Sequence, residues 1–108
     1  MSKQYVVDRT RWAKLGIFDQ MGNIYSEVGR SFKADDEKTQ KQSIARAIDL
    51  FNATIYVLRE SQSPRAKEVR RAKQQFLEMV TDKNASQKSI QSLDRYFLQF
   101  AIAARLNR

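Results

Sequence analysis

The feature that most constrains this chain is an apolar residue at every third or fourth position from Trp12 to Phe32. One helix face would then carry Trp12, Leu15, Phe18, Met21, Tyr25, Val28 and Phe32. The same stretch holds all three glycines, although each glycine weakens a helix by about 1 kcal/mol relative to alanine. Because Gly22 and Gly29 share one flank of the apolar face, we predict that another helix approaches closely there. The stretch is therefore predicted to be a central helix from Asp8 or Thr10 to Ser31 or Phe32.

Three further helices are predicted from similar spacing and from polar breaks. The second begins at the acidic residues 35–37, whose charge complements the positive end of a helix dipole, and ends near Glu60. Ser61-Gln62-Ser63-Pro64 is the clearest boundary, because its second serine can cap a helix that begins at its proline. This third helix extends to about Val80, and the fourth follows a polar break over 81–86 and continues to the C-terminus.

Size and composition restrict the architecture. The chain has 108 residues, of which 42% are hydrophobic and 30% charged, so it can bury one core. One proline and three glycines argue against a sheet with many turns. We predict an all-α fold, an antiparallel four-helix bundle that forms a single domain over residues 1–108. Residues 1–9 have no helical period, and they either form a mobile arm or dock on the bundle through Tyr5, Val6 and Val7.

Membrane, metal and catalytic chemistry find little support in the residues. No window approaches the apolar length of a membrane span, and the N-terminus lacks the apolar core of a signal peptide, so we expect a cytoplasmic protein. Without cysteine or histidine, the chain has no catalytic Cys-His or Ser-His pair and no usual zinc ligands. The cluster Asp35, Asp36 and Glu37 suits a helix start better than a metal site. We therefore expect no enzyme activity, no cofactor and no bound metal.

The strongest candidate site for a partner is a cluster of basic residues. Twenty Lys and Arg against twelve Asp and Glu give a net charge of +8, which attracts polyanions such as RNA or DNA. Five basic residues fall within nine positions, namely Arg65, Lys67, Arg70, Arg71 and Lys73. The central three are spaced so that they share one helix face, which would neutralise several phosphates. An ordinary solvated helix surface is the alternative interpretation, because basic helix faces are common.

Other residues indicate contacts between proteins. The last helix is apolar nearly all round, since Leu98, Ile102 and Leu106 form a second stripe beside the core stripe. We predict a homo-oligomer that uses this helix, and the alternative is a helix covered on two sides within its own bundle. Tyr56 lies off the apolar stripe of its helix and is a candidate either for an interface or for stacking on bases.

Two segments resemble a bacterial protein family. The first reads Asn23-Ile24-Tyr25-Ser26-Glu27-Val28-Gly29-Arg30, and the second, after a polar gap, reads Ser43-Ile44-Ala45-Arg46-Ala47. They are similar to four-helix-bundle proteins encoded by intervening sequences of large-subunit ribosomal RNA genes, and to related accessory proteins of diversity-generating retroelements. That family has Asn-Ile-x-x-Glu-Gly-x-x-Arg before a helix, and Val28 stands where the family has glycine. The resemblance implies a basic helical bundle, sometimes a ring-shaped oligomer, with nucleic-acid contact and no known catalytic residues.

Two functions therefore remain as hypotheses. The first is a non-enzymatic protein that binds nucleic acid through the Lys/Arg face of the third helix. The second is a homo-oligomeric protein-interaction or scaffold module with no nucleic-acid role, which holds its partner through the last helix and the face of Gly22 and Gly29.

Overall fold

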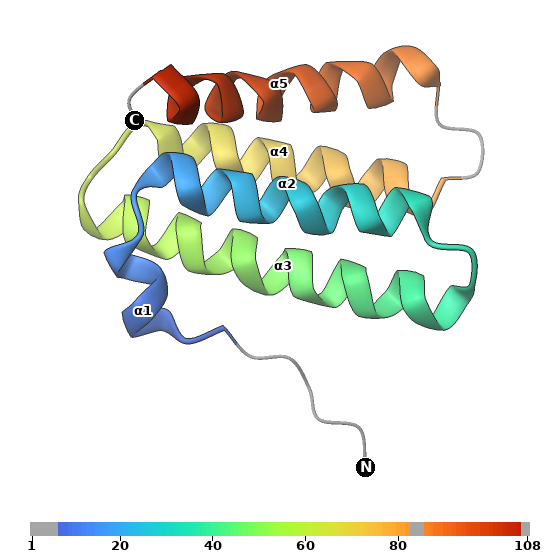
Figure 1. The fold of residues 1–108 in the computed structure, drawn as a ribbon, viewed down its shortest axis with the longest axis horizontal. Helices are drawn as coiled ribbons and strands as arrows, with labels where there is room; N and C mark the ends of the chain where they lie inside the picture. The colour runs from blue at the N-terminus through green and yellow to red at the C-terminus, as the bar shows by residue number, and fades with distance from the viewer. Residues whose placement is uncertain (1–6, 83–85, 107–108) are drawn as a thin grey trace.

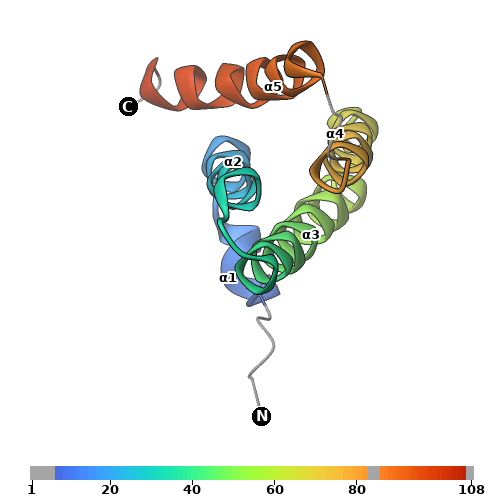
Figure 2. The same ribbon diagram turned by 90° about the vertical axis from the view of Figure 1, so that its right-hand side faces the viewer.

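A computed structural model describes residues 7–82 and 86–106, and this part of the chain is all helical, as predicted. Its helices are α1 (Arg9–Lys14), α2 (Ile17–Lys33), α3 (Glu37–Glu60), α4 (Arg65–Val80) and α5 (Gln87–Leu106). In Figure 1, α3, α4 and α5 each run back in the direction roughly opposite to that of the long helix before it, and the short α1 packs against α3. In the end view of Figure 2, α5 lies across α2 and α4, and its C-terminal end extends beyond α2. None of the described helices has both the length and the apolar character needed to cross a membrane.

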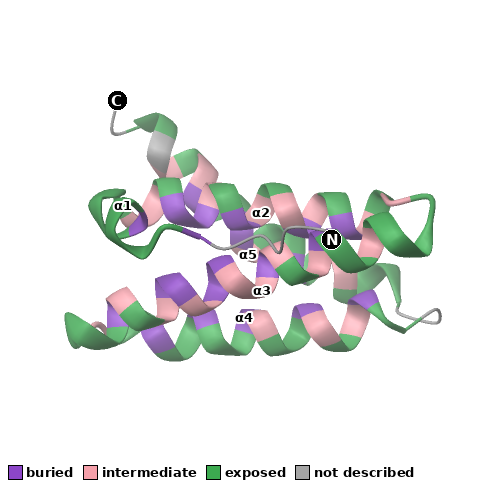
Figure 3. Ribbon diagram, turned by 90° about the horizontal axis from the view of Figure 1, so that it is seen from below, coloured by how far each residue is buried: buried purple, intermediate pink, exposed green. Residues whose placement is uncertain are grey.

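The core lies where the four long helices face one another. Figure 3 shows buried positions on the inner sides of the helices and exposed positions on their outer sides. The ring of Phe51 on α3 lies 6.0 Å, centroid to centroid, from both Phe76 on α4 and Phe97 on α5. All three side chains are fully buried, so the predicted apolar stripes of these helices meet as expected.

The predicted first helix is wrong, because the chain breaks between α1 and α2. Leu15 and Gly16 have extended backbones, with ψ angles of 143° and 160°. The side-chain amide of Gln20 stabilises this break, since its Nε2 donates to the carbonyls of Trp12 at 3.1 Å and Leu15 at 2.8 Å. Carbonyl groups at the end of a helix lack the usual partners within the helix, and here the Trp12 carbonyl also accepts from the Leu15 backbone N–H at 3.0 Å. After the break, Leu15 is exposed instead of joining the core as predicted.

A buried polar chain joins the broken helix pair to α3. The Trp12 indole Nε1 donates to Thr54 Oγ1 at 2.9 Å, and that hydroxyl donates to Gln20 Oε1, also at 2.9 Å. All three residues are buried. The predicted core positions of Trp12 and Thr54 are confirmed, whereas Gln20 is a core residue that the apolar repeat does not identify. Burial is tolerated because each polar group has a partner.

The prediction that a helix approaches Gly22 and Gly29 closely is also wrong. A Cβ atom added at either glycine would meet no atom of another helix within 4 Å. Gly29 instead lines a groove of about 540 Å³ between α2 and α5. Both glycines lie within α2 with negative φ, so neither the backbone nor the packing requires glycine there.

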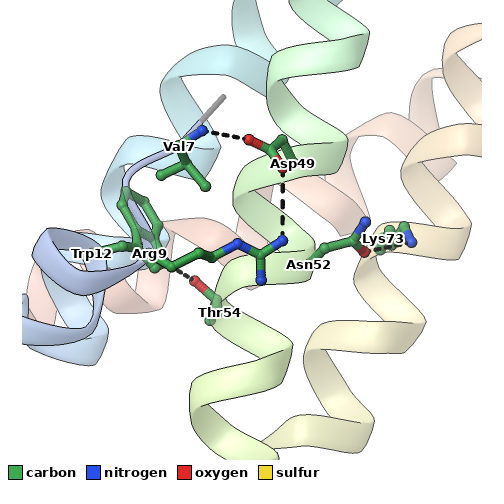
Figure 4. Close-up of polar contacts among 7 residues, drawn as sticks. All are labelled: Val7, Arg9, Trp12, Asp49, Asn52, Thr54 and Lys73. Carbon is green, nitrogen blue, oxygen red and sulfur yellow. Dashed lines mark hydrogen bonds and ion pairs between the residues drawn. The ribbon is translucent and has the colours of Figure 1, made fainter. Parts of the chain in front are cut away.

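The start of the described chain docks on α3. Val7 is buried, and its backbone N–H donates to Asp49 Oδ2 at 2.7 Å (Figure 4). Arg9 Nη2 lies 3.7 Å from Asp49 Oδ1. In this structure Val7 and Arg9 thus lie against α3, the arrangement expected of a docked N-terminal segment. The rest of that prediction, which concerns Tyr5 and Val6, falls outside the described residues.

Two aspartates begin helices, as predicted. Asp8 caps α1 by accepting from the backbone N–H groups of Thr10 and Arg11. Asp36 caps α3 by accepting from the Thr39 backbone N–H at 2.7 Å, and this hydrogen bond lowers the pKa of its carboxyl. The acidic cluster at the start of α3 therefore includes an N-cap.

The turn between α3 and α4 lies where the sequence places it, over residues 61–64. Gln62 has a φ of 56°, in the left-handed region. The Ser63 N–H donates to the Leu58 carbonyl at 2.8 Å, and the Gln62 N–H donates to the Arg59 carbonyl at 3.0 Å. These two bonds close the end of α3 in the pattern usual for a left-handed helix cap. Ser63 Oγ then accepts from the Arg65 N–H at 3.2 Å, which starts α4.

Candidate functional site

The basic residues of α4 point outward because its apolar residues are needed inside. The buried face of α4 consists of Ala66, Val69, Ala72, Phe76 and Val80. These positions repeat every three or four residues, so the intervening charged residues lie on the opposite side. The sequence of α4 thus presents its cations to solvent.

Most of these cations line one groove between α3 and α4, which we call the basic groove. Its volume is about 560 Å³. Five cations line it, and the remaining lining residues are two amides and two aliphatic side chains: Arg59, Lys67, Arg70, Arg71, Lys73, Asn52, Gln74, Ile55 and Leu77. The lining includes no carboxylate, and none of the five cations forms an ion pair with a carboxylate of the described residues. The groove is therefore lined by concentrated positive charge, with no carboxylate among the lining residues.

One cation of the basic groove is held in place by α3. Lys73 is half-buried, and its Nζ donates to Asn52 Oδ1 at 2.7 Å. Figure 4 shows the two side chains meeting between α3 and α4. This bond uses one of the three N–H groups of the ammonium, so the others can still donate to an anion. Lys67, Arg70 and Arg71 are exposed.

Arg65 does not line the basic groove with the other four predicted residues. Its guanidinium carbon lies 5.6 Å from the centroid of the Phe100 ring on α5, a distance typical of a cation–π contact. Lys67 and Arg71 line, in addition, a hollow of about 310 Å³ between α4 and α5. The structure thus gathers four of the five predicted cations and turns the fifth toward α5.

Tyr96 forms part of the wall of that second hollow. Burial raises the pKa of its phenol to about 12, and the nearby Glu68 carboxylate adds to the increase, whereas Arg65 opposes it. The hydroxyl oxygen is buried and accepts or donates no hydrogen bond within the described residues. Tyr96 therefore stays neutral at physiological pH and adds no negative charge beside the basic groove.

Arg59 is a groove residue that is not among the predicted site residues. It lies in the last turn of α3, and the four-residue connection to α4 brings it beside Lys67 and Arg70. Asn52, Ile55 and Arg59 are spaced by three and four residues, so they share one helix face. That spacing, together with the short turn, is a signal that would have indicated their common surface.

The candidate interface residues are exposed, as predicted. Leu98, Ile102 and Leu106 on α5 are 44%, 49% and 79% exposed. Because all three side chains are exposed, the alternative that α5 is covered on two sides does not hold for these residues. Tyr56 is 58% exposed, and it lies on α3 rather than beside this stripe. Whether these residues contact a partner stays a prediction.

Neither a metal site nor a similar known protein gives further information about the basic groove. Within residues 7–82 and 86–106, no three or more acidic side chains are grouped so that they could hold a metal ion. Comparison of the chain with protein-family models, curated proteins and solved structures finds no match.

Proposed function

We propose that this protein is a non-enzymatic, basic four-helix-bundle protein that binds nucleic acid through the basic groove. The observation that carries the proposal is the gathering of Arg59, Lys67, Arg70, Arg71 and Lys73 around one groove without a carboxylate. Phosphate groups are the ligands that such a surface attracts most strongly, since lysine and arginine neutralise them and release their counterions. RNA and DNA both present phosphates in a continuous row.

The groove also has features that suit the sugar–phosphate backbone of a nucleic acid better than a single anion. Its cations come from two helices and are spread along about two turns of α4, so they would meet successive phosphates. The amides of Asn52 and Gln74 can donate to phosphate or sugar oxygens. None of these contacts reads a base edge, so we expect binding with little sequence preference.

The test is binding of RNA and DNA oligonucleotides across a salt series, with reversal of three exposed cations. If five phosphates are contacted, the slope of log affinity against log salt is about −3.5 for a single strand and about −4.5 for a duplex. The variant Lys67→Glu/Arg70→Glu/Arg71→Glu should bind far more weakly and reduce the magnitude of the slope by about 2 to 3.

The matched control reverses three exposed cations outside the basic groove, Lys38→Glu/Lys88→Glu/Arg95→Glu. It changes the net charge equally, so a loss confined to the first variant assigns binding to the groove. If both variants lost the same affinity, net charge alone would explain the binding. If the groove variant bound as wild type does, the proposal would be wrong. Circular dichroism should give the same helical spectrum for both variants.

We further propose that the protein forms a homo-oligomer through α5. The support is the exposed stripe of Leu98, Ile102 and Leu106, because three apolar side chains on one helix face lose unfavourable contact with water when they are covered. The scaffold function is the second candidate, and the same stripe favours it. A protein partner that is recovered equally well after nuclease treatment, from a protein that binds no oligonucleotide, would favour the scaffold.

A further inference from the structure

A third hollow, on the surface of α3, adjoins the basic groove. It has a volume of about 500 Å³ and is lined by Arg9, Asn52, Ile55, Tyr56, Arg59 and Glu60. Three of these residues, Asn52, Ile55 and Arg59, also line the basic groove. The two hollows are therefore adjacent parts of one surface that extends from α1 over α3 to α4. Figure 4 shows Arg9, Asn52 and Lys73 following one another across α3.

Tyr56 is the aromatic residue of this surface. Its side chain is 58% exposed, and in the described part of the chain its ring packs against no other aromatic ring. Tyr25, by contrast, stacks on Phe97, and Tyr96 packs edge to face against the same ring. Tyr56 thus has an aromatic surface that no ring of the protein uses, beside the guanidinium-bearing Arg59.

The charges around Tyr56 are arranged differently from those of the basic groove. Glu60 is the single carboxylate among the residues that line this hollow. Arg9 is partly neutralised by Asp49, whose Oδ1 lies 3.7 Å from Arg9 Nη2. A phosphate is therefore attracted more strongly to the Arg59 side and the basic groove than to Tyr56 itself. What suits the Tyr56 position is an aromatic, uncharged group attached to a phosphate chain.

We propose that the ligand of this surface is a single-stranded nucleic acid, with one base stacked on Tyr56 and its backbone passing Arg59 into the basic groove. This inference rests on the proposed function and names its substrate class. A side chain can stack on a base only when the face of that base is free, and in a duplex the neighbouring pairs cover it. The surface thus selects unpaired strands, in RNA or DNA, over duplexes of the same length.

The test measures binding of wild type, Tyr56→Ala and Tyr56→Phe to four probes of equal length. The probes are a mixed-sequence RNA strand, the same DNA strand, an abasic DNA strand and a blunt DNA duplex. Loss of one stacked base should weaken binding of the alanine variant to the RNA or DNA strand about five- to 150-fold. The phenylalanine variant keeps the ring and should bind as wild type does. Because Tyr56 is exposed, neither substitution should change the helical spectrum.

The abasic strand and the duplex are the controls for this proposal. Both should bind wild type more weakly than the normal strands and respond little to Tyr56→Ala, since the abasic strand has no bases and the duplex exposes base faces only at its two ends. If Tyr56→Ala binds the normal strands as wild type does, or loses affinity for the abasic strand to the same extent, base stacking is overturned. Failure of the inference alone leaves the charge-reversal effect at Lys67, Arg70 and Arg71 intact. The proposed function fails if the charge-reversal variant binds the probes as wild type does, and a wild type with no affinity for any probe overturns both proposals.

Discussion

At the scale of single residues, a few buried polar side chains set the geometry of the N-terminal part of the fold. Gln20 accepts from Thr54 through its oxygen, and its nitrogen donates to two carbonyls at the end of α1. Thr54 in turn accepts from the Trp12 indole. The orientation of α1, and with it the position of Arg9 beside α3, therefore depends on a chain of side-chain hydrogen bonds.

We expect Thr54→Val to destabilise the protein although valine has nearly the same shape as threonine. The substitution leaves the Trp12 N–H and Gln20 Oε1 buried without partners, which typically costs about 1–3 kcal/mol in the free energy of unfolding. Urea denaturation followed by circular dichroism measures this change. Thr81→Val is the control, because Thr81 is exposed and lies outside the polar chain, so it should cost much less. Equal stabilities of the Thr54→Val variant and wild type would mean that the polar chain does not hold the fold.

At the scale of helices, the sequence predicts the all-helical fold class and most helix boundaries, but it does not predict the break in the first helix. Periodicity identifies the apolar faces of α3, α4 and α5, and the turn over 61–64 follows from its cap and its proline. The break before α2 depends on Gln20, a polar residue in the core, and a count of apolar positions cannot assign it. The residues of the basic groove are likewise predicted only in part. Lys67, Arg70, Arg71 and Lys73 share one helix and are predicted together, whereas Arg59 joins them only through the packing of α3 on α4.

Helix α2 carries two glycines that its structure does not require. We predict that Gly22→Ala and Gly29→Ala each raise the free energy of unfolding by about 0.5–1 kcal/mol, because alanine favours the helix and meets no atom of another helix within 4 Å. Thermal unfolding monitored by circular dichroism is the measurement. Gly16→Ala is the matched comparison. Gly16 is the N-cap of α2, where alanine is a poor residue, so it should give no such gain. A loss of stability at Gly22 or Gly29 would contradict the open packing around them.

At the scale of the whole molecule, the proposed binding surface and the proposed assembly surface use different helices. The basic groove lies between α3 and α4, and its continuation reaches α1, whereas the exposed apolar stripe belongs to α5. The two proposals can therefore be tested by separate substitutions in the same protein.

We predict that wild type has the mass of an oligomer by light scattering and that Leu98→Glu/Ile102→Glu has the mass of a monomer. The two glutamates replace one exposed leucine and one exposed isoleucine, so their charges disrupt the proposed contact without entering the core. Ser92→Glu/Gln99→Glu places equal charge on exposed positions of α5 beside the stripe and should leave the mass unchanged. A monomeric wild type at high concentration would contradict assembly through α5.

The position of α5 outside the basic groove has a further consequence for affinity. No residue of α5 lines the basic groove, so copies joined through the α5 stripe would each keep a groove of their own. Once one groove holds a long strand, the next groove meets the same strand at a high effective concentration. Avidity of this kind would let weak, sequence-independent contacts with a few nucleotides add up to firm retention of a long strand, while short fragments are released quickly.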